Sequence, residues 1–534
     1  MPKNIVICSD GTGNTAIKGR GTNVFKLFEA TDLIGHRRHP DLDPQVALYD
    51  DGVGTENFKP LKIFAGVTGF GLSRNVKQLY KELVRIYDPG DRIFLFGFSR
   101  GAFTARTLAG FIAMCGILDV KNLATAAALE TAVRGLYKVY RKSYRTELMK
   151  VFLGPPNPSV VKEFRETHCL AGEVPIRFMG VWDTVDAVGL PFHISDFVNL
   201  VFYRFKFRDH VLSKSVEHAC HALAIDDQRH SFHPLLWCEG AGDAGRIEQV
   251  WFAGAHSNVG GGYPKQGMSL VALEWMLRKA EEAGLRVLDS DKVLYCEHAN
   301  VDDKLYDPRA GVGIFYRWKP RDIAAICRDN RVNPTLHLSV LERIAHGTDD
   351  YAPGNLPPNA KVVITPTGED DKDAAADERA RGVQAVLTAA HGGGSSLLSR
   401  VRTEIVIGRT AYYLYLVTLV ALVLAASMSE SVRSTLKNAV LLIVHAVTLQ
   451  LGEVYTSLQT LGSSPWLVGL LLGGFLLSYV LYLYADRRMS AEFSEFWHKA
   501  QPDLRGGLKQ ARRTANLSRP PKKEVGHHGM TSSG

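Results

Sequence analysis

Phe94-Leu95-Phe96-Gly97-Phe98-Ser99-Arg100-Gly101-Ala102-Phe103 is the segment that most clearly predicts the fold class of this chain. An apolar run suited to a buried strand leads into a Gly-x-Ser-x-Gly turn, and apolar residues at helical spacing follow at once. In a strand–turn–helix of this kind the serine hydroxyl stands above the edge of a sheet, beside the positive end of the new helix. The pattern therefore predicts that Ser99 is a nucleophile. The alternative is a tight turn with a purely structural role.

The segments around this turn alternate between short apolar runs and helical patterns. We expect strands at 4–8, 45–49, 92–96, 175–182 and 246–253, and helices that include 23–33 and 73–87. Strands separated by helices predict an α/β fold, an α/β-hydrolase-like doubly wound, mostly parallel sheet. Two segments do not fit the alternation, 119–172 and 187–236. We interpret them as helical insertions that cap a site, or as plain scaffold helices.

Composition narrows the class of protein. The chain has 534 residues, which exceeds the usual single domain, and a net charge of +8 without a dense basic stripe, so we expect no nucleic-acid partner. Its seven cysteines are odd in number and lack CxxC spacing, which indicates reduced thiols. The first residues lead directly into an apolar strand, so we expect no secretory signal peptide. The oligomeric state does not follow from the sequence.

Two long uncharged apolar segments lie in the last quarter of the chain. Residues 411–427 and 466–485 are each close to the roughly 20 residues that span a bilayer. Between them, 438–449 is shorter and is either interfacial or a third crossing. Arginines precede the first span and follow the second, so the positive-inside rule places the catalytic domain and the C-terminus in the cytoplasm. We expect an integral protein of a bacterial inner membrane; the alternative is a pair of buried helices.

These patterns divide the chain into four parts. We expect a catalytic domain at 1–357, a linker rich in Asp, Ala and Gly at 358–405, a transmembrane hairpin at 406–488, and a basic, disordered tail at 489–534.

A serine nucleophile needs a base and a group that orients the base. In doubly wound hydrolases the chain order is serine, acid, histidine. Here Asp183 follows the expected strand at 175–182, and His256 follows the strand at 246–253. We therefore predict a catalytic triad of Ser99, Asp183 and His256, with Asp186 as the alternative acid.

The same turn predicts an oxyanion hole built from backbone N–H groups. The amide of Arg100 is one expected donor, and Gly11 or Thr12 in the loop after the first strand supplies the other. We expect Asp10 to hold its own loop through backbone hydrogen bonds. No metal or other cofactor is expected. The minor alternative is a metal site formed by four histidines, His218, His221, His230 and His233. Against it, 218–221 looks helical, and no set of cysteines or carboxylates completes a coordination sphere.

Six motifs in order resemble the DUF2235 α/β-hydrolase domain, which also occurs in type VI secretion phospholipase effectors of the Tle1 class. They are SDGTGN at 9–14, DGVGT at 51–55, GFSRGA at 97–102, GVWDTV at 180–185, HALAID at 221–226 and WFAGAHSNVGGGY at 251–263. The resemblance covers about 3–357, including SVLER at 339–343. It implies esterase or phospholipase activity, with Ser99, Asp183 and His256 at the triad positions. The family usually has Asp at the position of Asn258 and often Trp at that of Gly13.

The combined expectation is a membrane-anchored serine hydrolase that cleaves carboxyl esters, with a phospholipid or other lipid ester as substrate. One alternative is a catalytically inactive hydrolase fold that serves as a membrane-tethered binding module. The other is a lipase effector delivered by type VI secretion.

Overall fold

The computed structural model describes residues 2–11, 21–51, 70–122, 125–142, 158–186, 210–310, 316–365, 373–391, 397–428 and 465–517. Several expected features lie outside the described residues. They are Thr12, most of the DGVGT motif, the first part of the second insertion at 187–209, the region 429–464 with its short apolar run, and the end of the tail at 518–534.

The core of the fold is one eight-stranded sheet in which every paired strand is parallel. The order is β2-β1-β3-β4-β5-β6-β7-β8. The strands are β1 Asn4–Ser9, β2 Gln45–Asp50, β3 Arg92–Phe98, β4 Ile176–Trp182, β5 Val216–Ala224, β6 Ile247–Phe252, β7 Thr335–His337 and β8 Lys361–Val363. This confirms the predicted α/β class.

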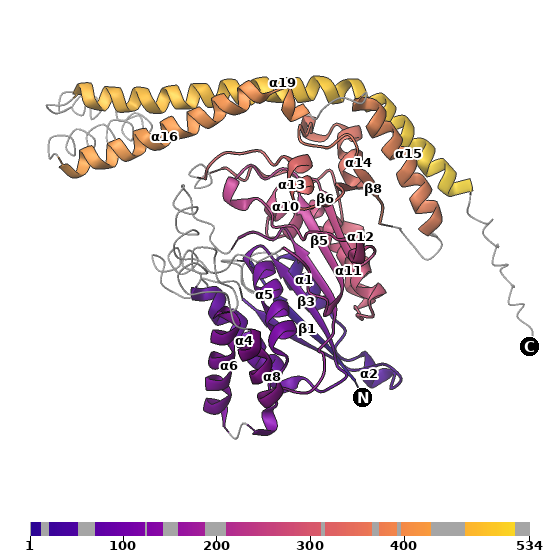
Figure 1. The fold of residues 1–534 in the computed structure, drawn as a ribbon. Coiled ribbons are helices and arrows are strands. Elements are labelled where there is room, and N and C mark those ends of the chain that lie inside the picture. The colour runs from indigo at the N-terminus through magenta and orange to yellow at the C-terminus, as the bar shows by residue number, and fades with distance from the viewer. Residues whose placement is uncertain are drawn as a thin grey trace, which may run out of the picture.

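Helices cover both faces of the sheet (Figure 1). Alternate residues of the central strands point to opposite faces, and each set is buried in its own cluster: Ile5 and Leu95 with one helical layer, Val6 and Phe96 with the other. The first layer contains α4 Phe70–Ile86, α5 Arg100–Cys115, α6 Ala126–Lys142 and α8 Pro158–His168. The second contains α1 Asn23–Ala30, α11 Gly267–Glu282 and α12 Asp289–His298. The remaining α/β-domain helices are α2 Gly35–Arg38, α10 His256–Gly260, α13 Ile323–Asp329 and α14 Leu338–His346.

The sheet changes direction of winding at β1. The chain passes from β1 to β2 on one side and then to β3 on the other, so the loops that follow β1 and β3 diverge. In open parallel sheets ligands bind at such a switch point, outside the carboxyl ends of the strands. Asp10 follows β1 and Ser99 follows β3, so both lie at this position.

The expected insertions are part of the scaffold where they are described. In the first, α6 and α8 pack on α5, and Leu136, Tyr137 and Tyr140 are buried in the core cluster of that face. In the second, the helical interpretation of 218–221 was wrong, because these residues belong to the central strand β5. Both faces of β5 are covered, so its alanine-rich sequence shows no alternation of polar and apolar residues that marks a half-exposed strand.

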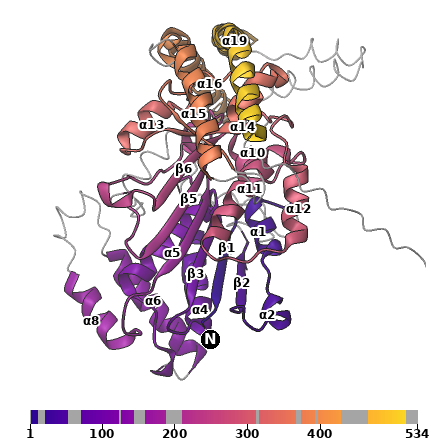
Figure 2. The same ribbon diagram turned by 90° about the vertical axis from the view of Figure 1, so that its right-hand side faces the viewer.

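Two helices extend beyond the α/β domain. In Figure 1, α16 Arg402–Met428 and α19 Pro465–Leu517 run side by side above α10 and α13, and in Figure 2 the same pair is seen nearly end-on above the sheet. Among the described residues these are the two helices whose length and composition would allow a membrane crossing, at Arg402–Leu422 and Gly469–Lys509. Both regions overlap the spans expected from the sequence.

The segments on either side of this helix pair differ from expectation. The supposed linker at 358–405 contains the edge strand β8 and the helix α15 Asp373–His391. Ala380, Val383 and Leu387 of α15 are buried, and their helical spacing explains why this stretch folds against the domain. The supposed tail is helical up to Leu517, because α19 continues past the apolar span and buries Trp497 and Leu504 against the same cluster.

Candidate active site

The turn between β3 and α5 holds Ser99 in a strained backbone conformation. Ser99 has φ 58° and ψ −121°, a backbone conformation that residues other than glycine rarely adopt. The two flanking glycines are required for space. A Cβ at Gly101 would lie 2.1 Å from the carbonyl oxygen of Ser9, and one at Gly97 would lie 2.6 Å from the backbone of Ala102. The Gly-x-Ser-x-Gly pattern thus lets β1, β3 and α5 approach closely enough to present the serine.

Ser99, His256 and Asp183 form one line of hydrogen bonds. His256 Nε2 lies 2.7 Å from Ser99 Oγ, and His256 Nδ1 lies 2.6 Å from Asp183 Oδ2. All three side chains are buried. Both ring nitrogens of His256 are occupied by these partners, so Asp183, and not the alternative Asp186, is the acid that contacts the histidine. The structure brings together the three residues that the sequence predicted for a triad.

An arginine that the sequence did not predict as a site residue binds the carboxylate of Asp183. Arg321, in the segment before α13, donates from Nη1 to Asp183 Oδ1 and from Nη2 to Asp183 Oδ2, each at 2.8 Å. The same guanidinium donates to the carbonyl oxygens of Ala224 and Phe232. The amide of Ala224 is a second donor to Asp183 Oδ1, at 3.0 Å. These donors compensate a carboxylate with no exposure to solvent.

The electrostatics of the site favour an ionised acid and a neutral base. Burial alone would raise the pKa of Asp183, but the charge of Arg321 and the hydrogen bonds from Arg321 and His256 hold it well below its usual range. Burial lowers the pKa of His256, and the nearby carboxylate of Asp183 opposes this shift without cancelling it. At neutral pH the histidine is therefore free to accept a proton, and the carboxylate fixes its orientation and tautomer.

A second acidic residue supports the loop that carries His256. Asp227, which is fully buried, accepts from the amide of His256 at 3.4 Å and from the guanidinium of Arg229. Arg229 in turn lies over the ring of Phe232 at 3.5 Å. The rings of Phe98 and Phe232 lie 4.7 and 5.0 Å from the His256 ring. The imidazole is thus confined between two aromatic side chains.

The departure at Asn258 has a structural explanation. Asn258 Nδ2 donates to the carbonyl oxygen of Lys304 at 3.0 Å, and Oδ1 accepts from the amides of Ala255 and Tyr306. An aspartate at this position could accept the same two bonds, but it would place a negative oxygen against the Lys304 carbonyl. The asparagine therefore suits the loop of this chain and leaves the contacts of His256 in place.

The expected oxyanion donors are placed differently from one another. Arg100 is the first residue of α5, and its amide lies directly after Ser99. The amide of Gly11 donates to Oδ1 of Asp10 at 2.6 Å. Asp10 Oδ2 also accepts from the hydroxyls of Thr22 and Tyr49. Asp10 thus ties its loop together, and Gly11 is engaged in that tie.

The candidate metal histidines are separated. His218 and His221 lie three residues apart on β5 and so point to opposite faces of the sheet. His221 is buried and accepts from the amide of Thr184, and His233 Nε2 lies 3.1 Å from the carbonyl oxygen of Lys319. In the part of the chain that the structure describes, no group of three His, Cys, Asp or Glu side chains could hold a metal ion.

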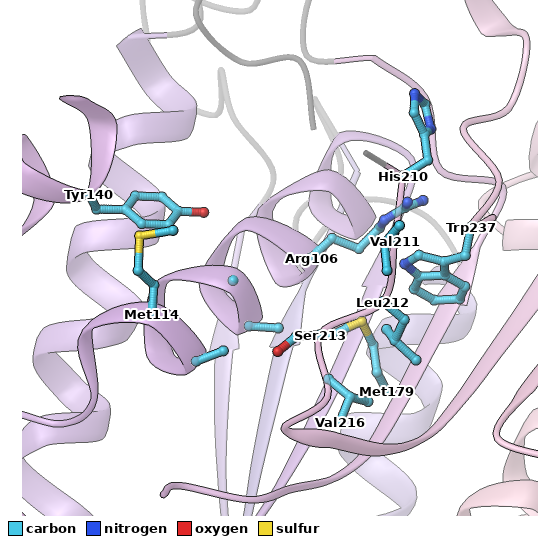
Figure 3. A pocket seen from close by; sticks show the side chains of 13 residues that line it. Arg106, Met114, Tyr140, Met179, His210, Val211, Leu212, Ser213, Val216 and Trp237 are labelled. Carbon is cyan, nitrogen blue, oxygen red and sulfur yellow. The ribbon is translucent and has the colours of Figure 1, made fainter. Parts of the chain in front are cut away.

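A cavity borders the buried side chains that hold the loop after β4. It has a volume of about 360 Å³ and lies beside α5, and Figure 3 shows Arg106 and Trp237 on its wall. Arg106 donates to the carbonyl oxygen of Leu235, and the amide of Leu235 donates to the carbonyl oxygen of Thr184. The Trp237 ring meets the His221 ring edge-on at 5.5 Å. Burial lowers the pKa of His221 to about 3, so its ring stays neutral and accepts from Thr184. The network supports the loop that carries the acid.

An all-parallel sheet with a serine, a histidine and an aspartate joined at the ends of its strands defines the hydrolase class of α/β proteins. Residues 3–279 match the family described as T6SS, phospholipase effector Tle1-like, catalytic domain. Because this match spans more than half of the chain, the chain belongs to that family. Membership supports a lipase or phospholipase type of function.

One curated relative and two solved structures are similar to the chain. The uncharacterized protein YEL023C of Saccharomyces cerevisiae is 29% identical over 257 residues, which are 44% of this chain and 33% of that protein. The chain therefore spans about a third of that relative. An uncharacterized protein from Pseudomonas aeruginosa has a TM-score of 0.31 at 18% identity, covering 72% of this chain and 59% of its own. The Tle1 effector bound to the VgrG spike of the type 6 secretion system has a TM-score of 0.27 at 20% identity, covering 49% and 51%. At these TM-scores neither superposition bears on the site.

Proposed function

We propose that this chain is a membrane-anchored serine hydrolase that cleaves carboxyl esters of lipids, with a phospholipid as the favoured substrate class. The observation that carries the proposal is the buried line from Ser99 Oγ through His256 to Asp183, with contacts of 2.7 and 2.6 Å. Membership of a phospholipase effector family supports the choice of a lipid ester.

The proposed reaction has two halves. Ser99 Oγ attacks the acyl carbonyl carbon while its proton passes to His256 Nε2, and the tetrahedral intermediate collapses as His256 returns that proton to the leaving alcohol oxygen. The acyl group then rests on Ser99. A water molecule attacks the acyl carbon, gives a proton to His256, and releases the carboxylic acid as the proton returns to Ser99 Oγ. Asp183 stays ionised throughout and stabilises the imidazolium that forms in each half.

The negative charge on the carbonyl oxygen needs donors near Ser99. We propose the amide of Arg100, which adjoins Ser99 at the start of α5, where the helix dipole adds to its effect. The second donor is proposed in the loop after β1, from Gly11 or Thr12. Gly11 would first have to release the bond of its amide to Asp10.

We propose that α16 and α19 anchor the chain in a bacterial inner membrane, with the α/β domain and the C-terminus in the cytoplasm. Both helices leave the domain on the same side and pack against each other, as a hairpin requires (Figure 1). Arg400 and Arg402 precede the apolar stretch of α16, and Arg487 and Arg488 follow the apolar stretch of α19. Anchoring raises the effective concentration of a lipid substrate at the enzyme.

The decisive experiment compares Ser99→Ala with Ser290→Ala in the purified full-length chain. Ser290 lies exposed at the start of α12 and serves as the matched control. We expect Ser99→Ala to lower hydrolysis of a panel of phospholipids by at least about 10³-fold and to abolish labelling by a fluorophosphonate probe. Unchanged hydrolysis in Ser99→Ala would refute the proposal, and a wild-type chain that neither labels nor hydrolyses would indicate an inactive binding module.

The family name provides a second candidate function, a lipase effector delivered by type VI secretion. Cell fractionation separates it from a resident enzyme. A resident anchored enzyme stays in the membrane pellet of the producing cell after alkaline carbonate extraction. A delivered effector appears in the medium when the secretion system is active.

A further inference from the structure

We propose that the segment Trp318–Arg321, here called the strap, couples the position of the α16–α19 helix pair to the carboxylate of Asp183, with Arg321 as a positioning residue. The inference rests on the proposed serine hydrolase function. It goes beyond it by assigning the helix pair a role in organising the triad, in addition to its role as an anchor.

At its inner end the strap binds the carboxylate of Asp183 through the side chain of Arg321. The Arg321 side chain has no exposure to solvent and forms two hydrogen bonds of 2.8 Å with Asp183. Because the fork is planar and rigid, a displacement of the arginine changes the orientation of the carboxylate that holds His256.

The outer end of the strap is seated against the helix pair. Trp318 is 2% exposed and forms a cluster with side chains from the residue before α16, from the first turn of α16 and from the middle of α19. The members are Val401, Ile405, Met489 and Phe493. A Cβ at Gly408 of α16 would lie 2.8 Å from the indole, so this helix passes directly over the ring. A change in how the two helices pack against each other therefore displaces the Trp318 indole.

The strap between these ends is short and tied on its flank. Two residues lie between its ends, and the three steps from Trp318 to Arg321 reach at most about 11 Å. Trp318 Nε1 donates to Gln228 Oε1 at 2.9 Å, and the amide of Lys319 donates to the carbonyl oxygen of Gln228 at 2.8 Å. His233 Nε2 contacts the carbonyl oxygen of Lys319 at 3.1 Å. A segment held this closely passes a displacement of the indole on to Arg321.

A cavity lies along the same boundary. It has a volume of about 720 Å³, and both Trp318 and Arg321 line it, together with Met489 and Phe493 of α19. The strap therefore packs on the helices at Trp318 and borders a cavity that α19 lines on its other side, so α19 has room to shift relative to the domain.

The consequence for the base follows from charge. Loosening Arg321 leaves the Asp183 carboxylate less neutralised, which favours the imidazolium form of His256. The other groups that face the pair include the carboxylates of Asp226 and Asp227, the guanidinium of Arg229 and the neutral rings of His221 and His233. His221 lies on the strand β5, whereas Asp227 and Arg229 flank Gln228, which is bonded to the strap, so the change in basicity reports on Arg321 together with this neighbouring segment.

The test uses a push on the strap from the helix side. Gly408→Ala places a methyl group against the Trp318 indole, whereas Gly473→Ala, the matched control on α19, meets nothing within 4 Å. The pH dependence of kcat/KM is measured on a soluble chromogenic ester, with the full-length chain in nanodiscs. We expect Gly408→Ala to lower kcat/KM about tenfold, less than the hundredfold of a full ångström of misplacement, and to move the acidic limb to higher pH. The control should match the wild type.

A second variant checks that the effect passes through the indole. The atoms that the new methyl group would meet belong to the six-membered ring of Trp318, so adding Trp318→Phe to Gly408→Ala removes the clash. Because both lack the indole bond to Gln228, we expect this double variant to match Trp318→Phe alone and so to recover most of the kcat/KM and of the acidic limb that Gly408→Ala loses. The proposal is overturned if the pH profile of Gly408→Ala superimposes on that of the wild type. It is also overturned if the double variant recovers none of the lost kcat/KM. Failure of the hydrolase proposal is separate, because it shows as unlabelled Ser99 in the wild type.

Discussion

Arg321 and Asp183 form a completely buried ion pair in which both carboxylate oxygens accept from the same guanidinium. The acid that orients His256 is therefore neutralised by a fixed positive charge on its far side. This positive charge lowers the basicity of His256. It also keeps the Asp183 carboxylate ionised and fixed in a site without solvent exposure.

The first prediction concerns this pair. Arg321→Gln leaves Asp183 buried without its charge partner, and we expect it to destabilise the fold by about 3–5 kcal/mol. Arg321→Lys keeps the charge but loses the planar fork, so we expect it to retain most of the stability and to lose activity about tenfold or more. Thermal unfolding in detergent and hydrolysis of a soluble ester measure the two effects. Equal activity of Arg321→Lys and the wild type would show that the fork geometry is unimportant.

The second prediction concerns pH. His256 acts as a base only when neutral, so kcat/KM should rise with pH as His256 loses its proton. Burial lowers the pKa of His256, so the midpoint of this rise should lie below the ordinary histidine value of about 6.5. A pH–rate profile of the wild type on a soluble ester checks this. His298→Gln, which alters an exposed histidine of α12, should leave the profile unchanged, and a midpoint above 6.5 would contradict the expectation.

The third prediction concerns the turn glycine. Gly101→Ala brings a methyl group to 2.1 Å from the Ser9 carbonyl oxygen, and this backbone contact cannot be relieved by a side-chain rotation. We expect a loss of at least about 3 kcal/mol in the free energy of unfolding, at the upper end for overpacking. Gly135→Ala on α6 is the control, since nothing lies within 4 Å of its Cβ, and helix propensity should make it neutral or stabilising by up to about 1 kcal/mol. Indistinguishable melting curves for the two variants would argue against the close approach of α5 to β1.

The fourth prediction concerns the far end of α19. Trp497 is 1% exposed and donates from Nε1 to the carbonyl oxygen of Pro353. Trp497→Ala should therefore cost about 3–5 kcal/mol, as for other buried tryptophans. Lys499→Ala, two residues along the same helix, removes an exposed side chain paired with Glu495 and should cost less than about 1 kcal/mol. If both variants unfold at the wild-type temperature, this part of α19 is not docked on the domain.

The local patterns of the chain predicted the parts of the site that depend on short-range order. The strand before Ser99 and the helix after it follow from one apolar run and two glycines, and the loops with Asp183 and His256 follow from strands of the same kind. Arg321 had no such signal. It lies 138 residues beyond Asp183, and the fold alone brings the two together.

The misjudged segments have a common physical cause. The strand β5 and the helix α15 are rich in alanine, which carries little pattern, and their identity is set by what they pack against. The charged stretch after 488 looked like a tail because only one stripe of it is apolar. That stripe is the side of α19 that buries Trp497 and Leu504 against the domain.

The continuity of α19 has a mechanical consequence. Its 53 residues span roughly 80 Å, and no proline interrupts it between Pro465 and Trp497, where it is fixed to the domain. Helices that exceed the local hydrocarbon thickness tilt to fit, and a tilt of about 10° swings a point about 40 Å away by about 7 Å. An anchored α/β domain would follow that swing as a rigid lever. Leaflet thickness would then decide how far above the headgroups Ser99 is held, and the lipid surroundings of the enzyme would select which ester bonds it reaches.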